Sequence, residues 1–169
     1  MRPQPGDFAP FYQKYIDLVP DGDIVELLIQ AKDELIALLQ AIPPNKWDYR
    51  YAEDKWSIRE VMLHLIDSER IFAYRALRIA RNDRTPLSGF DQDAYVPASN
   101  AANRSWDSII SEYIAVRDAS IQLYKNFIPE MWQNTGSANN NPVTVLALAY
   151  IIYGHERNHL KIFHERYLN

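Results

Sequence analysis

Apolar residues recur every three or four positions along four segments of the 169-residue chain, with polar residues between them. This spacing places the apolar side chains on one face of an α-helix. No segment shows strong alternation of apolar and polar residues, the pattern of a half-buried strand, and the chain has only five glycines. We therefore predict an all-α protein, a four-helix bundle around one core. The predicted helices span about residues 23–41, 57–80, 105–127 and 142–166.

Local start and stop signals support these helix boundaries. Asp23 stands where the first helix begins, and Pro43, the first of two consecutive prolines, follows its end. Ser57 and Glu60 have the spacing of a capping box, in which two side chains satisfy free backbone N–H groups at a helix start. Pro142 is a favourable first residue for the fourth helix.

The segments outside the predicted helices differ in character. Residues 1–22 contain four aromatic side chains, so we expect a packed N-terminal arm. Residues 42–56 are also aromatic and are expected to cover one end of the bundle. Residues 82–104 are long enough to cross over the bundle, and a connection of this length is often a functional covering loop. Residues 133–141 are polar and rich in turn formers, which predicts a loop.

Composition narrows the class of protein. The length favours a single domain over residues 1–169, and 47% apolar with 24% charged residues is ordinary for a globular protein. The net charge of −4, without any basic run, argues against a nucleic-acid partner. The absence of cysteine excludes disulfides, cysteine metal ligands and a cysteine nucleophile, and it fits a cytoplasmic location. The longest apolar run, around residues 143–153, is too short to span a membrane, and no signal-peptide core begins the chain.

Two histidines, His155 and His159, extend the apolar stripe of the fourth predicted helix. Side chains four residues apart on a helix share a face, with Cβ atoms about 5–6 Å apart, so both imidazoles can reach one metal ion. The same residues spell the His-Glu-x-x-His pattern of zinc peptidases, in which Glu156 would be the base. That mechanism usually takes a third ligand from downstream. The histidine available there, His164, lies about 180° around the helix from His155, so we do not favour a peptidase.

The remaining histidine, His64, lies beside the apolar stripe of the second predicted helix. Taken alone, it is more simply explained as a core histidine bonded to a backbone carbonyl or a hydroxyl, and this interpretation stays open. Beside the pair, in a chain with four histidines, it favours a metal site formed by His64, His155 and His159. Three protein ligands leave a coordination position open, which is typical of catalytic sites. Zn, Ni, Fe and Mn all accept imidazole, so the choice of metal stays open.

Three segments, residues 55–70, 89–96 and 147–159, resemble the DinB/YfiT-like superfamily. They read KWSIREVMLHLIDSER, GFDQDAYV and ALAYIIYGHERNH. The resemblance extends over nearly the whole chain, and the three motifs together are specific, whereas the His-x-x-x-His spacing alone is not. The resemblance implies an up-down-down-up four-helix bundle with a divalent metal on the histidine triad named above. Characterised relatives include transferases and isomerases that use low-molecular-weight thiols, and many members have no assigned reaction.

Four other residues are candidates for a catalytic role. Asp67 follows the histidine of the second helix by three positions, and Asp91 and Tyr95 lie in the long connection, where they could touch a substrate. A helix cap, a surface contact or loop packing is an alternative role for each. Glu156 is turned about 100° from the ligand face, so pairing with an arginine such as Arg70 or Arg75 is its favoured role.

The leading hypothesis is a divalent-metal-dependent enzyme with an open three-histidine site, acting as a thiol S-transferase or a hydrolase. Without a cysteine in the chain, any thiol must be a low-molecular-weight co-substrate. The alternatives are a non-catalytic, metal-stabilised stress-response or binding protein, and a scaffold that has lost catalysis. We expect a small-molecule substrate in a pocket between the N-terminal arm and the long connection. No nucleic-acid or membrane partner is expected, and a homodimer stays open.

Overall fold

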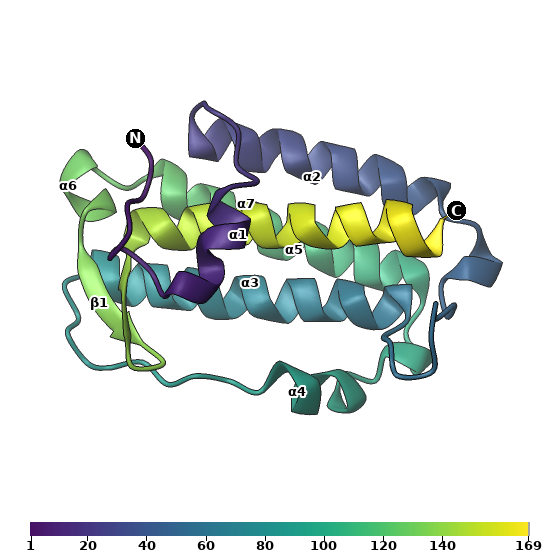
Figure 1. Ribbon diagram of the computed structural model, residues 1–169. Coiled ribbons are helices and arrows are strands. Elements are labelled where there is room, and N and C mark those ends of the chain that lie inside the picture. The colour runs from purple at the N-terminus through teal and green to yellow at the C-terminus, as the bar shows by residue number, and fades with distance from the viewer. Residues whose placement is uncertain (169) are drawn as a thin grey trace.

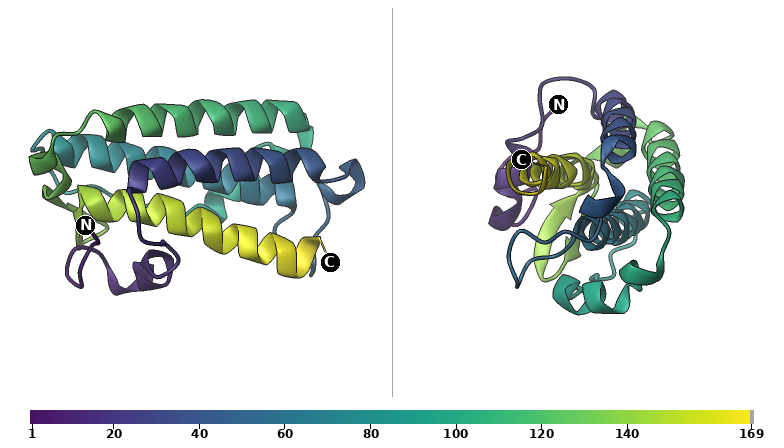
Figure 2. Two further views of the ribbon diagram at one scale, coloured as in Figure 1. Left: turned by 90° about the horizontal axis from the view of Figure 1, so that it is seen from above. Right: turned by 90° about the vertical axis from the view of Figure 1, so that its right-hand side faces the viewer.

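The computed structural model describes residues 1–168, and its four long helices lie side by side as a bundle (Figure 1). They are α2 (Ile24–Ala41), α3 (Ile58–Ala80), α5 (Trp106–Lys125) and α7 (Val145–Ile162). Helices α2 and α7 run in one direction and α3 and α5 in the other, which is the up-down-down-up order (Figure 1, Figure 2). Helix α3 packs against α5 and α7, and α2 packs against the same two helices. The predicted all-α four-helix bundle is confirmed.

Each long helix begins at a polar residue whose side chain accepts hydrogen bonds from free backbone N–H groups. Asp23 does this for α2, and Ser105 and Thr144 do it for α5 and α7. At the start of α3, the N–H of Ser57 donates to Glu60 Oε2 at 2.7 Å, and the N–H of Glu60 donates to Ser57 Oγ at 3.3 Å. This reciprocal pair is the predicted capping box.

A small antiparallel hairpin precedes α7. Its strands are β1 (Thr135–Ala138) and β2 (Asn141–Thr144). Between them, Asn139 and Asn140 have φ angles of 49° and 60°. Two successive residues with positive φ are what a tight two-residue hairpin turn requires, and asparagine tolerates this conformation better than most residues.

The hairpin corrects the predicted start of the fourth helix. Pro142, expected as its first residue, lies in β2 opposite Ser137, and α7 begins at Val145. The predicted loop over residues 133–141 is likewise mostly strand and turn. Four-residue strands with little alternation give no clear period, so the proline and the polar residues dominated the prediction. At its other end, α7 continues into a π-helical turn, η4 (Phe163–Tyr167).

The long connection between α3 and α5 runs along the length of the bundle, as expected (Figure 1). It contains α4 (Gln92–Ala98) and the 3-10 turn η3 (Ala101–Asn103). Two backbone hydrogen bonds of 2.9 Å tie it to the hairpin, from the N–H of Leu87 to the carbonyl of Ser137 and from the N–H of Asn139 to the carbonyl of Leu87. The hairpin therefore fixes the first part of the connection.

The N-terminal arm is packed, as predicted. It contains the 3-10 turn η1 (Pro10–Tyr12) and α1 (Gln13–Ile16), and α1 lies against α7 (Figure 1). Several of its side chains belong to the buried core, namely Phe8, Tyr15, Ile16 and Val19.

The aromatic stretch before α3 covers one end of the bundle. It contains the 3-10 turn η2 (Pro44–Lys46), and Trp47 stacks on Trp106 of α5 with 5.2 Å between ring centroids. The hydroxyl of Tyr167 donates to the carbonyl of Trp56 at 2.6 Å, which ties η4 to the same end. The short helix α6 (Pro129–Trp132) lies at the opposite end (Figure 1). No helix among residues 1–168 is long and apolar enough to cross a membrane.

A buried arginine in α5 contacts the other three long helices. The Nε and Nη2 groups of Arg117 donate to the two carboxylate oxygens of Glu69 on α3 at 2.8 and 2.9 Å. Nη2 also donates to Glu156 on α7 at 2.7 Å, and Nη1 donates to the carbonyl of Leu28 on α2 at 3.4 Å. The hydroxyl of Tyr113 donates to the same Glu156 oxygen at 2.8 Å. Burial alone would lower the pKa of Arg117, but the charges of Glu156 and Glu69 outweigh it, so the guanidinium stays charged.

The change Arg117→Met should lower the free energy of unfolding by about 3–5 kcal/mol, because Glu69 and Glu156 would then be buried without a cation. Urea-induced unfolding followed by circular dichroism measures this loss. The control is Arg70→Met. Arg70 also links α3 to α5, through Glu112 at 2.6 Å, but its side chain is 48% exposed. That change should cost about 1 kcal/mol or less. Equal losses in the two variants would contradict a stabilising role for the buried cluster.

Candidate metal centre

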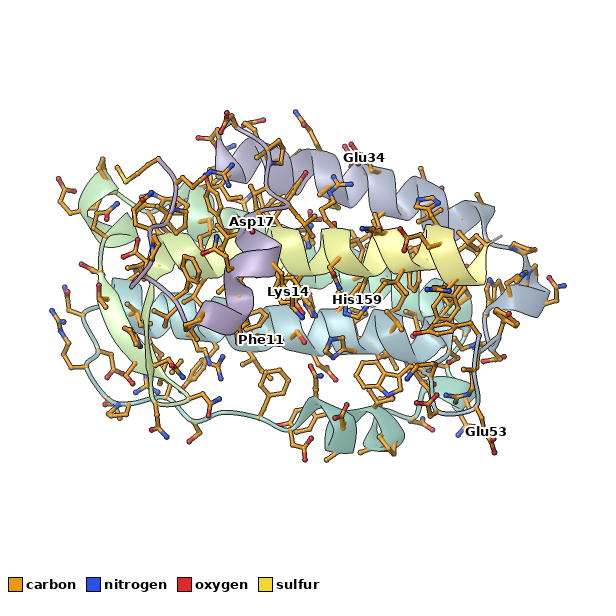
Figure 3. All side chains as sticks on the ribbon, in the orientation of Figure 1. Phe11, Lys14, Asp17, Glu34, Glu53 and His159 are labelled. Carbon is orange, nitrogen blue, oxygen red and sulfur yellow. The ribbon has the colours of Figure 1, made fainter. Side chains whose placement is uncertain are left out.

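Three histidines meet where α3 packs against α7. His64 lies on α3, and His155 and His159 lie one turn apart on α7. The Nε2 atom of His155 is 3.0 Å from Nε2 of His64 and 3.2 Å from Nε2 of His159. Figure 3 shows His159 between α7 and α3, beside Lys14 of the arm. The structure thus brings together the three residues that the sequence predicts as metal ligands.

This arrangement fits one divalent metal ion. Nitrogen ligands at about 2.0–2.1 Å from a tetrahedral zinc ion lie about 3.3 Å from one another, close to the separations seen here. Two neutral imidazoles can share one N–H···N hydrogen bond, but Nε2 of His155 faces two other Nε2 atoms at once. Within residues 1–168, this is the one group of histidine, aspartate and glutamate side chains spaced to hold a metal. Metal ligation itself stays a prediction.

The surroundings of the histidines favour their neutral form. Burial lowers the pKa of His64 from 6.5 to about 4. Burial, followed by the neighbouring His64 and Lys14, lowers the pKa of His159 to about 3. The pKa of His155 is shifted in the same direction, mainly by burial and then by His159. Only a neutral imidazole offers a lone pair to a metal, so the lowered pKa values leave these three side chains in the form that a metal site requires at neutral pH.

Aromatic side chains enclose the histidines. Trp56 lies 4.9 Å from His64 and Tyr15 lies 5.2 Å from His155, measured between ring centroids. Phe72 approaches His155 edge-on at 6.3 Å. These contacts restrict the rotation of the imidazoles and surround them with apolar surface, so the ligand geometry is fixed by packing.

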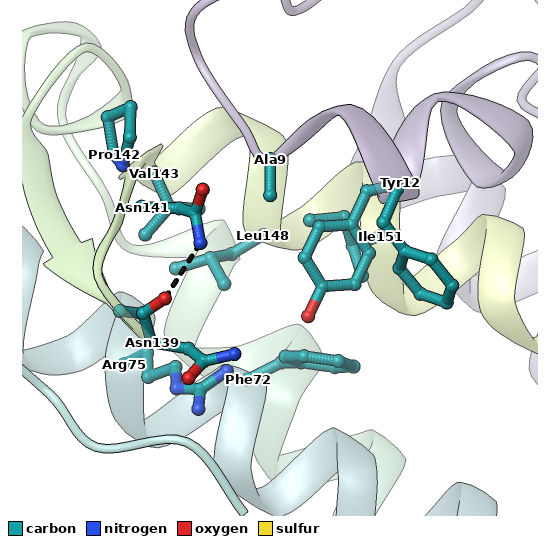
Figure 4. Close-up of a pocket in the computed structure, with 12 residues that line it drawn as sticks. Ala9, Tyr12, Phe72, Arg75, Asn139, Asn141, Pro142, Val143, Leu148 and Ile151 are labelled. Carbon is teal, nitrogen blue, oxygen red and sulfur yellow. Dashed lines mark hydrogen bonds between the residues drawn. The ribbon is translucent and has the colours of Figure 1, made fainter.

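One hollow is lined by a histidine of the site, and another lies beside Phe72, which contacts His155, whereas the sequence predicted a single pocket. One, of about 230 Å³, is lined by His159 together with Lys55, Trp56, Asp93 of α4 and Tyr167. The other, of about 170 Å³, lies on the arm side of Phe72 and is drawn in Figure 4. The long connection contributes Asp93 to the first hollow, and the arm contributes Ala9, Phe11 and Tyr12 to the second.

The sequence suggested that Glu156 pairs with an arginine such as Arg70 or Arg75. In the structure Glu156 pairs instead with Arg117. The expected interhelical pairing exists, but its partner is on α5. Burial raises the pKa of Glu156, an effect that the charge of Arg117 opposes. Its Oε1 atom is buried and has no hydrogen-bond partner within residues 1–168. Glu156 directly follows His155, so its contact with Arg117 ties the turn of α7 that carries His155 to the interior of the bundle.

The other candidate residues serve local structure. Asp67 pairs with Arg70 at 3.6 Å. Asp91 accepts hydrogen bonds from the first backbone N–H groups of α4 and is its cap. Tyr95 is 45% exposed and packs against Phe90 at 5.6 Å. Catalytic roles for Asp67, Asp91 and Tyr95 stay untested predictions.

Sequence reasoning missed the charged groups near the histidines. Arg117 lies on the same face of α5 as Tyr113 and Tyr124, and all three side chains are buried. An arginine on an otherwise core-facing stripe signals a buried ion pair, and this signal was available. Lys14 gave no such signal, because its place beside the histidines depends on how the arm folds back.

The arm approaches α7 most closely at Gly154, the residue before His155. A Cβ atom at this position would overlap the backbone carbonyl group of Tyr15. Glycine therefore lets the backbone of α1 lie directly on α7, and this close approach places the Tyr15 ring against His155.

Comparisons with known proteins agree with this fold. Residues 27–163 match the DinB superfamily. Among solved structures, the chain is similar to YfiT from Bacillus subtilis, described as a probable metal-dependent hydrolase with an unusual four-helix bundle topology. The TM-score is 0.75 at 14% identity, over 87% of this chain and 90% of that chain. No curated protein matches the chain.

The change Gly154→Ala should displace the arm and destabilise the protein by about 1–3 kcal/mol, the usual cost of overpacking. Without the overlap, alanine in a helix would stabilise by about 0.5–1 kcal/mol, so the sign of the effect is decisive. Urea unfolding measures the free energy, and limited proteolysis measures release of the arm. A stabilised variant with a protected arm would contradict the close contact between Gly154 and Tyr15.

The metal-free protein should lose stability as the pH falls from about 6.5 toward about 4. The unfolded chain takes up protons on its histidines near pH 6.5, whereas the folded-state pKa values of His64 and His159 are about 4 and about 3. Between these pH values the unfolded state binds the protons and the folded state does not, so acidification favours unfolding. The contribution of the neutral histidines to the free energy of unfolding is fully present above about pH 6.5. Urea unfolding in the presence of a chelator, measured across this pH range, gives the slope of the free energy of unfolding against pH.

The matched variants are His64→Gln and His164→Gln. The first removes a buried histidine and should flatten the pH dependence, while the second removes an exposed one and should leave it unchanged. The same pH dependence of stability in both variants and in the parent would contradict a lowered pKa for the buried histidines.

Proposed function

This chain belongs to the DinB superfamily, and we propose that it is a divalent-metal-dependent enzyme whose ion is held by His64, His155 and His159. The convergence of three Nε2 atoms from neutral, enclosed imidazoles is the observation that carries the proposal. The similarity to YfiT, described as a probable metal-dependent hydrolase, supports it further. An all-imidazole donor set suits Zn, Ni, Fe or Mn.

The protein side chains around this centre hold the ligands and admit a substrate. Trp56, Tyr15 and Phe72 fix the imidazole rings and keep bulk water from their sides. The hollow beside His159 gives a small molecule access, and Lys55 in its wall offers a charged contact. A bound ion would supply Lewis-acid chemistry that activates a water molecule or a thiol.

The nucleophile in the proposed reaction is water or a low-molecular-weight thiol. In hydrolysis, the water oxygen forms a bond to an electrophilic carbon, the bond to the leaving group breaks, and the leaving group departs with a proton. In S-transfer, the thiol sulfur forms the new bond to the electrophilic carbon, the bond to the leaving group breaks, and the leaving group departs with the thiol proton. Because the chain has no cysteine, the sulfur must come from a diffusible co-substrate.

A cytoplasmic location and a homodimer are further parts of the proposal. The absence of cysteine suits a reducing compartment. The outer faces of α3 and α5 support a homodimer, because Tyr74 and Leu77 are 52% and 39% exposed there and border a shallow apolar hollow with Val116 and Leu123.

Each of the changes His64→Ala, His155→Ala and His159→Ala should lower bound metal roughly tenfold or more, because two imidazoles hold a divalent ion far more weakly than three. Metal content is measured by plasma mass spectrometry after equilibration with zinc and gel filtration. The control is His164→Ala, which removes an exposed histidine of η4 and should bind like the parent. Full metal content in His64→Ala would contradict the triad.

The activity test compares the metal-loaded, chelated and reloaded protein on one panel of substrates. The panel holds carboxylic esters, amides and electrophiles offered with a low-molecular-weight thiol. We expect turnover that chelation abolishes and metal restores. A large loss of thermal stability on chelation, without turnover of any substrate, would instead support a non-catalytic protein in which the metal ties α3 to α7.

A further inference from the structure

Among residues 1–168 two arginines are buried, and one of these two has a carboxylate partner. Arg117 is 1% exposed and lies between Glu69 and Glu156. Arg75 on α3 is 4% exposed, yet within residues 1–168 it forms no ion pair. Removing a cation from water costs several kcal/mol unless an anion compensates it. The buried charge of Arg75 therefore points to an anion from outside the chain that compensates it.

The neighbours of Arg75 hold its guanidinium without neutralising it. Nη2 donates to the backbone carbonyl of Ser88 at 2.8 Å, and the hydroxyl of Tyr12 is a hydrogen-bond partner. The rings of Phe72 and Phe90 lie 5.9 Å from the guanidinium carbon. A carbonyl, a hydroxyl and two rings are all neutral, so they orient the charge and leave it unbalanced.

Arg75 lies in the wall of the 170 Å³ hollow on the arm side of the histidines (Figure 4). The hydroxyl of Tyr12 points into this hollow, toward the side where Arg75 and Asn139 lie (Figure 4). Asn141 lies nearby, and its Nδ2 donates to the backbone carbonyl of Asn139 at 2.7 Å. Apolar side chains form the remaining wall, namely Phe72, Val143, Leu148 and Ile151. The hollow thus combines one cation and neutral polar groups with an apolar surface, as small-molecule sites commonly do.

Elements distant in sequence keep this hollow in shape. The turn that carries Asn139 is tied to the long connection through Leu87. A Cβ atom at Gly89 would lie 2.7 Å from Oδ1 of Asn139, so the connection passes close to that side chain. Ser88, between these two residues of the connection, is the one that accepts from Arg75. The polar wall is therefore positioned by the fold and is not a chance grouping of surface side chains.

The charge and size of the hollow select among anions. A single guanidinium with apolar walls matches a singly charged carboxylate, whereas a phosphate near −2 would need more than one cation. The volume is similar to the roughly 150 Å³ of an apolar cavity that accommodates benzene. A carboxylate attached to a short chain or one ring fits both limits.

The hollow lies on the same helix faces as the histidines. Arg75 follows His64 by eleven positions on α3, a rotation of about 20° and a rise of about 16 Å, and its side chain leans back toward His64. Ile151 lies one turn before His155 on α7. Phe72 lines the hollow and also contacts the His155 ring. The hollow and the histidines are therefore neighbours along the interface between α3 and α7.

We propose that this hollow binds the carboxylate of the substrate through Arg75, Tyr12 and Asn139, so that the enzyme acts on compounds with a carboxylate at one end. The electrophilic carbon of such a compound would lie toward the histidines. The binding site stands on its own observations, and its assignment to the substrate rests on the proposed function.

The first test measures the binding of benzoate to the metal-free full-length protein by nuclear magnetic resonance. Benzoate should shift the signals of residues 135–144 and of the Arg75 side chain, while the neutral isostere benzamide should bind at least about tenfold more weakly. Arg75→Gln should weaken benzoate binding by about tenfold or more. The control is Arg78→Gln, one turn further along α3. Arg78 is partly exposed and already paired with Asp83, so this variant should bind like the parent.

Two further variants cover the case in which Arg75→Gln does not fold. Arg75→Lys keeps the charge without the forked donors, and Tyr12→Phe removes only a hydroxyl, so both should fold and bind benzoate more weakly. Equal binding of benzoate and benzamide, unchanged benzoate affinity in these variants, or preference for inorganic phosphate would each overturn the proposal.

His64→Ala separates this inference from the proposed function. It should lose metal and turnover but bind benzoate within about twofold of the parent, because Arg75 and His64 lie about 16 Å apart along α3. If any panel ester is turned over, its carboxylate-bearing analogue should show a lower KM than its carboxamide analogue, and Arg75→Gln should remove this difference with little change in kcat. Benzoate binding without any turnover would sink the proposed function and leave the carboxylate site standing.

Discussion

The burial of one positive charge, that of Arg117, is the constraint on which the rest of the bundle depends. A guanidinium in the interior must be met by carboxylates, and those that meet it come from α3 and α7. The same two helices carry the histidines, and Glu156 directly follows His155. The ion cluster therefore limits how α7 can rotate or slide against α3. This restriction lets three imidazoles from two helices point at one place.

Features that depend on spacing within one helix could be predicted from the sequence. The Ser57–Glu60 capping box and the pairing of His155 with His159 both follow from helical geometry. Features that depend on distant contacts could not. Arg117 finds its partners 48 and 39 residues away, and no local pattern joins them. The choice of His64 as third ligand needed the count of histidines and the family resemblance, because its contact with His155 spans 91 positions.

The surroundings of the site come from the segments that the sequence described least well. The arm, the long connection and the hairpin have weak periodicity, and their positions follow from contacts with the finished bundle. Gly154 shows the difference. In the sequence it is an unfavourable residue inside a helix, whereas in the structure it is the point where the arm meets α7. Pro142 gave a false helix start for the same reason, because pairing with β1 determines its conformation.

The position of the three histidines along the chain also bears on how the protein matures in the cell. A polypeptide emerges from the ribosome from its N-terminus at roughly 5–20 residues per second, so His64 is exposed well before His155 and His159 are made. Until then the nascent chain has no pair of histidines with which to chelate an ion. The three imidazoles therefore come together only after α7 has been made and has packed against α3, so the cluster is a product of the folded bundle and not of an early segment of the chain.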